Sequence, residues 1–127
     1  MNLEKVIFAF FIVLALTLNF GFFLGDIDNP DHHNVYELFA AIVISLIATV
    51  LKAGDRTHLG AVLLATSLVA DLQLIAAAVV WAIVVNVTGT GLSNEVMAAI
   101  VSLSGGALLA NITSVILLVS ETLMVRR

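Results

Sequence analysis

The chain has 127 residues, of which 61% are hydrophobic and 11% are charged, and none is cysteine. Soluble domains have about 45–50% apolar and about 25% charged residues, so the composition argues against a water-soluble domain. A mean hydropathy of +1.17 favours a protein whose surface is covered mostly by lipid. The absence of cysteine excludes disulfides and thiolate metal sites. With only five Lys plus Arg and no internal basic cluster, the sequence also argues against nucleic-acid binding.

Four apolar segments predict four membrane-spanning helices, at about 3–24, 35–52, 59–86 and 95–125. About 20 helical residues cross the hydrocarbon core, because each residue adds about 1.5 Å of a thickness near 30 Å. The first segment is longer than the apolar part of a signal peptide, so we expect it to be retained. The second is short and carries Glu37 near its start, so it spans only if nearly upright.

The connections between these segments are short and contain most of the turn-forming residues, including Pro30, Gly54, Gly89 and Gly91. Short connections place consecutive helices side by side and antiparallel. We therefore predict an all-α membrane protein, a single transmembrane domain over residues 1–127, folded as a four-helix up-down bundle.

The basic residues lie on one side of the predicted membrane. They are found at the two termini and in the second connection: Lys5, Lys52, Arg56, Arg126 and Arg127. The opposite side carries acidic residues and no Lys or Arg: Asp26, Asp28, Asp31, Glu37 and Glu95. The positive-inside rule then predicts that both termini are cytoplasmic. Such a one-sided distribution disfavours a dimer that inserts in both orientations.

Asp71 is the most informative residue for function. It follows Leu59 by twelve residues, so it lies roughly 18 Å into the third helix, close to the bilayer midplane. An Asp at a helix centre costs about 2.5–3.5 kcal/mol on insertion scales, and the surrounding apolar residues offset this. Asp71 should therefore face protein or a water-filled cavity, where a carboxyl group can bind a cation or a proton.

Other polar residues fall at a similar depth. Asn19 lies about 20 Å up the first helix and Asn111 about 21 Å up the fourth, while Ser67 lies one turn before Asp71. Thr17 and Gln73 are near enough in depth to join them. One interpretation is a midplane site that responds to a cation or proton, with Asp71 as the charged group and Asn19, Ser67 and Asn111 as neutral ligands. The other is an interhelical hydrogen-bond clamp, which is common between membrane helices.

The fourth segment carries small residues at every fourth position, a pattern that allows another helix to approach closely. They are Ala98, Ser102, Gly106, Ala110 and Ser114. The first segment repeats the pattern with Thr17, Gly21 and Gly25. Four thin helices leave little room for an internal pathway, so these stripes predict a homo-oligomer.

The first outer connection combines three carboxylates and two imidazoles: Asp26, Asp28, Asp31, His32 and His33. Such residues suit a hard cation, Zn²⁺ or Mn²⁺, but their spacing fits no calcium-loop pattern. An acidic, solvated turn that begins the second helix explains the cluster as well. No serine has the setting of a nucleophile and no histidine lies in the membrane near Asp71, so we expect neither an enzyme nor a cofactor.

Three stretches resemble a known family. They are residues 3–41, which include NFGFFLGDIDNPDHHNVYELFAA, residues 63–78, LLATSLVADLQLIAAA, and residues 102–112, SLSGGALLANI. They are similar to an uncharacterised family of small bacterial inner-membrane proteins, a domain of unknown function. The resemblance implies four helices in a bacterial inner membrane, and it implies no activity, cofactor or site residues.

Two functional hypotheses follow from the sequence. In the first, an oligomeric inner-membrane protein passes or couples to a small cation or proton through Asp71. In the second, the chain is a structural or accessory subunit that docks a larger membrane complex through its small-residue helix faces, and Asp71 pairs with a basic residue of the partner.

Overall fold

The computed structural model describes residues 3–89 and 91–125, so Arg126 and Arg127 of the predicted basic side lie outside the described residues. The chain folds into four long helices: α1 (Leu3–Phe23), α2 (Val35–Lys52), α3 (His58–Ala82) and α4 (Asn94–Val125). A short 3₁₀ helix, η1 (Pro30–His32), lies in the first connection, and a turn of π-helix, η2 (Ile83–Val87), extends α3. The described residues contain no strand.

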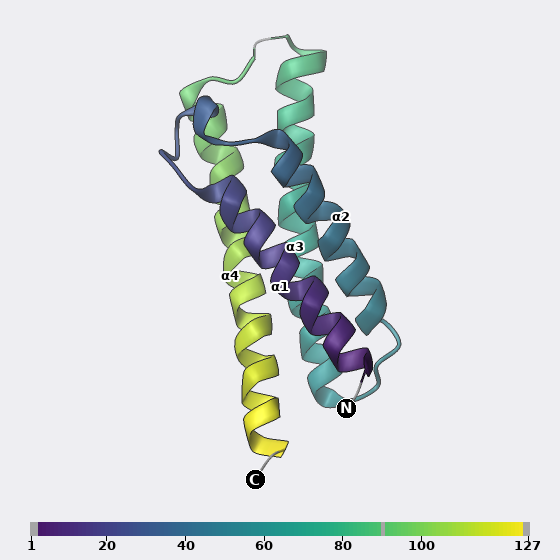
Figure 1. Cartoon of the computed structure of the whole chain (residues 1–127). Coiled ribbons are helices and arrows are strands. Elements are labelled where there is room, and N and C mark those ends of the chain that lie inside the picture. The colour runs from purple at the N-terminus through teal and green to yellow at the C-terminus, as the bar shows by residue number, and fades with distance from the viewer. Residues whose placement is uncertain (1–2, 90, 126–127) are drawn as a thin grey trace.

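The helices run alternately up and down, with the N- and C-terminal ends of the chain at the same end of the bundle (Figure 1). Each helix packs against two neighbours, in the ring α1, α2, α3, α4 and back to α1. All four are long and apolar enough to cross a membrane, α3 together with η2. The predicted all-α membrane fold is therefore confirmed, and the predicted helix bounds agree with the observed ones to within a few residues.

Side-chain caps fix where α2 and α3 begin. The Asn34 side chain accepts a hydrogen bond from Tyr36 N at 2.8 Å, and the Thr57 hydroxyl accepts one from Gly60 N at 2.9 Å. Each cap satisfies a backbone N–H that has no partner within the first helical turn. The connection from α2 to α3 covers residues 53–57 and joins two antiparallel helices.

The apolar core forms two clusters along the bundle. The larger lies toward the end with the connections α1–α2 and α3–α4, and includes Phe22, Leu38 and Ile100. The smaller consists of Phe8, Ile12, Ala48 and Leu63 and lies toward the end with the chain termini. Many large apolar side chains outside these clusters point outward, as a lipid-covered surface requires.

Gly25 does not belong to a helix-packing stripe, contrary to the sequence interpretation. It follows the end of α1 and has a φ of +101°, a conformation that favours glycine. A Cβ at this position would lie 2.6 Å from the Cβ of His32, so Gly25 lets the first connection fold back on itself. Its role is to make a turn, and α1 ends before it.

Candidate functional site

Asp71 lies inside the bundle, between α2 and α3, with only 5% of its surface exposed. Its two carboxyl oxygens contact two hydroxyl groups of α2. Ser45 Oγ lies 2.6 Å from Oδ1, and Thr49 Oγ1 lies 2.5 Å from Oδ2. Thr49 Oγ1 also lies 2.9 Å from the backbone oxygen of Ser45. The acid thus sits in a compact cluster of oxygen atoms supplied by its own chain.

The sequence placed Asp71 in the interior, but it did not identify Ser45 and Thr49 as its partners. Depths counted from the helix ends assume that neighbouring helices end at the same level. Here α3 begins beyond the end of α2 (Figure 1). Asp71, thirteen residues into α3, is therefore level with Ser45, seven residues from the end of α2. The signal in the sequence is the spacing of four between Ser45 and Thr49, which places both on one helix face.

Asn19, predicted as a neutral ligand near Asp71, instead joins α1 to α4. Its Nδ2 donates to the backbone oxygen of Ser104 at 3.0 Å, and Ser104 Oγ donates to its Oδ1 at 2.5 Å. Both residues are fully buried. This reciprocal pair is an interhelical clamp, the second interpretation offered for the polar residues. Thr17 is exposed, and its hydroxyl bonds to the backbone oxygen of Leu14.

Ser67 and Asn111 are buried but have unused hydrogen-bonding capacity. Ser67 Oγ and both polar atoms of Asn111 lack a hydrogen-bond partner among the described residues. Nearby on the same two helices, Thr66 Oγ1 and Ser114 Oγ lie 2.6 Å apart and link α3 to α4. Buried polar groups without protein partners are ordinarily satisfied by water. The buried faces of α3 and α4 therefore carry polar groups that do not bind Asp71.

Part of the small-residue stripe on α4 packs against α3 within the chain. A Cβ on Gly106 would lie 2.4 Å from Gln73 Oε1, so the missing side chain makes room for Gln73. Ser114 bonds to Thr66, whereas Ser102 is exposed. Ala98 and Ala110 are half-buried.

On α1, the glycine of the predicted stripe accommodates a side chain of the neighbouring helix. A Cβ on Gly21 would lie 2.1 Å from Glu37 Oε2, so the Glu37 side chain crosses Gly21 at the α1–α2 contact. Glycines at these two positions serve packing between helices of one chain.

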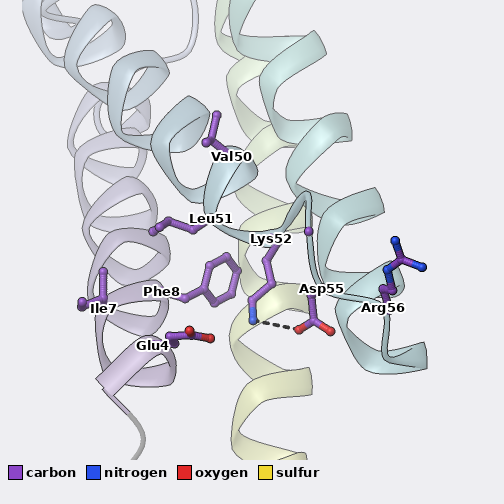
Figure 2. Close-up of a pocket in the computed structure, with 9 residues that line it drawn as sticks. Glu4, Ile7, Phe8, Val50, Leu51, Lys52, Asp55 and Arg56 are labelled. Atoms are coloured by element: carbon purple, nitrogen blue, oxygen red, sulfur yellow. Dashed lines mark hydrogen bonds and ion pairs between the residues drawn. The ribbon is translucent and has the colours of Figure 1, made fainter.

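A pocket of about 770 Å³ opens at the end of the bundle that carries the termini (Figure 2). Its apolar wall includes Ile7 and Leu51, and its polar groups include Glu4, Lys52 and Asp55. A second pocket, of about 240 Å³, lies at the same end and reaches inward to Phe8 and Leu63. Both residues belong to the smaller apolar cluster.

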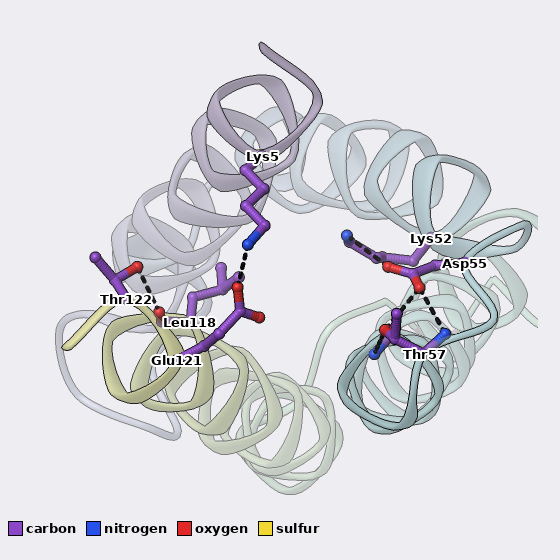
Figure 3. A network of polar contacts seen from close by, with 8 residues as sticks. Lys5, Lys52, Asp55, Thr57, Leu118, Glu121 and Thr122 are labelled. Atoms are coloured by element: carbon purple, nitrogen blue, oxygen red, sulfur yellow. Dashed lines mark hydrogen bonds and ion pairs between the residues drawn. The ribbon is translucent and has the colours of Figure 1, made fainter. Parts of the chain in front are cut away.

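Ion pairs lie at this end of the bundle (Figure 3). Lys5 of α1 bonds to Glu121 of α4. Lys52 Nζ lies 3.3 Å from Asp55 Oδ2 and 4.5 Å from the centre of the Phe8 ring. Each of these two lysines therefore lies beside a carboxylate, and Lys52 also lies over an aromatic face.

Hydrogen bonds lower the pKa of Asp55 from 3.8 to about 2. The largest contribution comes from the Thr57 hydroxyl, which donates to Asp55 Oδ1 at 2.7 Å, and the next from Thr57 N at 2.9 Å. Lys52 contributes a smaller lowering. Asp55 is consequently ionised at neutral pH and holds the turn that leads into α3.

The connection between α1 and α2 is not arranged as the metal site considered from the sequence. No group of three His, Cys, Asp or Glu among residues 3–89 and 91–125 is arranged to hold a metal ion. His33 Nδ1 lies 2.6 Å from the backbone oxygen of Phe22, and its Nε2 lies 2.8 Å from that of Asp26. His32 Nδ1 accepts a hydrogen bond from Asp26 N at 2.8 Å. The imidazoles bind backbone groups, and His33 caps the end of α1.

Asp28 and Asp31 are exposed in the same connection, where the N–H of Asp31 donates to the Asn29 side chain at 3.0 Å. This bond begins η1. The acidic residues therefore form a solvated turn, the other interpretation given for this segment.

The fold and the site together define a multi-pass helical membrane protein with one carboxyl group enclosed in its core. The chain belongs to a family of unknown function, DUF6394, which matches residues 32–122. This agrees with the uncharacterised family that the sequence resembles. The matched region includes Asp71 and both of its hydroxyl partners. Comparison with curated proteins and with solved structures found no match.

Proposed function

We propose that this chain is a non-catalytic membrane protein that conducts or couples to a small cation or proton through Asp71. The observation that carries the proposal is an acid enclosed within the bundle, 5% exposed, whose contacts are hydroxyl groups. No ion pair within 4 Å joins Asp71 to a basic group in the described part of the chain. Acidic residues in such a setting serve as proton and ion relays in membrane transport proteins.

The neutral clamps elsewhere in the bundle support a functional role for Asp71. Asn19 with Ser104, and Thr66 with Ser114, link helices without a titratable group. Interhelical hydrogen bonds of this kind contribute roughly 0.6–2 kcal/mol. A carboxyl group costs more to bury than an amide or hydroxyl and is not needed to make such a link.

The alternative, an accessory subunit that uses Asp71 to bind a partner's basic residue, has less support. Such a pair requires the carboxyl group to face outward, whereas both of its oxygens are engaged by α2. An inward-facing acid fits a role within this chain.

We further propose that both termini face the cytoplasm of a bacterium and that the chain lies in its inner membrane. Lys5, Lys52 and Arg56 lie at the end of the bundle with the termini, and the acidic connection from 24 to 34 lies at the other (Figure 1). The positive-inside rule supports this orientation. A homo-oligomer is proposed as the working assembly, and the exposed Ser102 offers a small-residue contact to a second copy.

Ion flux into proteoliposomes tests the function. Proton, Na⁺ and K⁺ gradients are applied in turn to vesicles with wild-type protein, Asp71→Asn or Ser114→Ala. We expect wild-type flux above that of empty vesicles, loss of flux in Asp71→Asn, and retention in Ser114→Ala, which removes a buried hydrogen bond elsewhere. Equal flux in wild-type and Asp71→Asn vesicles would contradict the proposal, as would wild-type flux no greater than that of empty vesicles.

A further inference from the structure

The three oxygen–oxygen contacts around Asp71 share two hydroxyl hydrogens. Three oxygen pairs lie within hydrogen-bond distance: Ser45 Oγ with Asp71 Oδ1, Thr49 Oγ1 with Asp71 Oδ2, and Thr49 Oγ1 with Ser45 O. Ser45 and Thr49 each carry one hydroxyl hydrogen, and a backbone oxygen carries none. All three contacts are therefore full hydrogen bonds only when the carboxyl group carries a proton.

From this geometry we infer that the ion bound at Asp71 is a proton, and that Thr49 is the residue that positions it. This inference rests on the function proposed above and names its substrate. In the protonated state Ser45 donates to Oδ1, Oδ2–H donates to Thr49 Oγ1, and Thr49 donates to the backbone oxygen of Ser45. All three contacts are then hydrogen bonds.

Loss of the proton leaves the heavy atoms where they are. The proton passes from Oδ2 to water, and the Thr49 hydroxyl rotates so that its hydrogen points to Oδ2. Ser45 O then loses its bond from the hydroxyl but keeps its place in the backbone ladder of α2. Both protonation states are hydrogen-bonded, so the exchange requires one hydroxyl rotation and a water molecule that accepts or returns the proton.

The same distances disfavour a metal cation. Ligand oxygens that share Mg²⁺ lie about 2.9 Å apart or more, because each is about 2.1 Å from the metal at right angles, and Ca²⁺ spreads its ligands further. Ser45 and Thr49 lie 2.6 and 2.5 Å from the carboxyl oxygens. Oxygen atoms this close share a hydrogen.

Charged groups on the elements that pack against α3 have their own contacts or lie far along the chain. On α2, Lys52 binds Asp55, and Glu37 crosses Gly21 of α1. On α4, Glu121 binds Lys5, and Glu95 lies in the first turn of the helix. His58, at the start of α3, is the other titratable group of that helix. The Asp71 contacts in the described residues are therefore with the hydroxyl groups of Ser45 and Thr49.

Infrared difference spectroscopy of the reconstituted protein tests the inference. Spectra are recorded as a function of pH in wild type, Asp71→Asn, Thr49→Val and Thr49→Ser, and as a function of Na⁺, K⁺ and Ca²⁺ at fixed pH. We expect a carbonyl band of a protonated carboxylic acid that titrates with pH, is absent in Asp71→Asn, and does not respond to metal cations. Thr49→Val should shift the band, because the acid loses its acceptor, and Thr49→Ser should restore it.

Proton flux provides the second measurement. Thr49→Val should lower the flux about tenfold, the order expected for one neutral hydrogen bond, and Thr49→Ser should retain it. A band that moves with Na⁺, K⁺ or Ca²⁺ would overturn the proton assignment while leaving ion coupling intact. Absence of any band that depends on Asp71 would overturn the inference too. A titrating band without flux would instead contradict the proposed transport. If Asp71→Asn does not fold, the comparison of Thr49→Val with Thr49→Ser and the cation titrations of wild type still test whether the bound ion is a proton.

Discussion

Two aspartates of this chain, in different parts of the fold, are hydrogen-bonded by hydroxyl groups. Asp71, inside the bundle, contacts Ser45 and Thr49, while Asp55, in the connection between α2 and α3, accepts two hydrogen bonds from Thr57. A hydroxyl group can donate or accept, so it serves a carboxyl group in either protonation state. At Asp55, the additional bond from a backbone N–H and the nearby Lys52 favour the charged form. The two acids therefore differ in their surroundings: Asp55 binds a backbone N–H and lies beside a lysine, whereas Asp71 binds hydroxyl groups.

The lowered pKa of Asp55 predicts a loss of stability in acid. The folded-state pKa of about 2 is below the ordinary value of 3.8, so this group stabilises the fold above pH 4. Its contribution is lost as pH falls from about 4 to 2, because the folded state must then take up a proton. In detergent, the unfolding temperature of wild type should fall over this range, and Asp55→Asn should show a smaller fall. Identical pH profiles for the two proteins would contradict this role.

At two contacts between helices in this bundle, a glycine on one helix leaves room for a polar side chain of the other. Gly21 admits the Glu37 side chain at the α1–α2 contact, and Gly106 admits Gln73 at the α3–α4 contact. Lipid surrounds the bundle, so there is little hydrophobic drive between helices, and close packing with hydrogen bonds must hold them. The polar residues of each helix thus specify its neighbours.

Replacing each of the two buried asparagines by leucine should affect the stability of the bundle differently. Asn19 makes two hydrogen bonds to Ser104, whereas the amide of Asn111 lacks a partner among the described residues. We expect Asn19→Leu to destabilise the bundle by about 1–2 kcal/mol. Asn111→Leu removes a buried polar group without protein partners and should be neutral or stabilising. Denaturation in mixed micelles compares the two variants, and equal destabilisation by both would show that Asn111 has an unassigned partner.

At the scale of the whole molecule, the charges are separated between the two ends of the bundle. The end with the termini carries Lys5, Lys52 and Arg56, and the acidic connection from 24 to 34 lies at the opposite end. The even number of crossings places both ends of the chain on one side of the membrane. By the positive-inside rule we expect insertion in a single orientation.

Cysteine labelling tests the orientation, because the native sequence has no cysteine. Asp28→Cys and Ala53→Cys each place one exposed thiol in a connection, at opposite ends of the bundle. In intact bacterial cells, a membrane-impermeant maleimide should label Asp28→Cys, and it should label Ala53→Cys only after the inner membrane is permeabilised. The reverse pattern would place the termini outside, and labelling of both in intact cells would indicate mixed insertion.

The sequence by itself determined the four spanning helices, the up-down order and the burial of Asp71. These features follow from the length of each apolar segment, from the turn residues between segments, and from the expense of exposing a carboxyl group to lipid. Only the tertiary structure decided that Asp71 meets Ser45 and Thr49 while Asn19 meets Ser104. Which side chains face each other depends on the relative height and rotation of packed helices. That height is set by where α3 begins beyond the end of α2, and no pattern along a single helix records it.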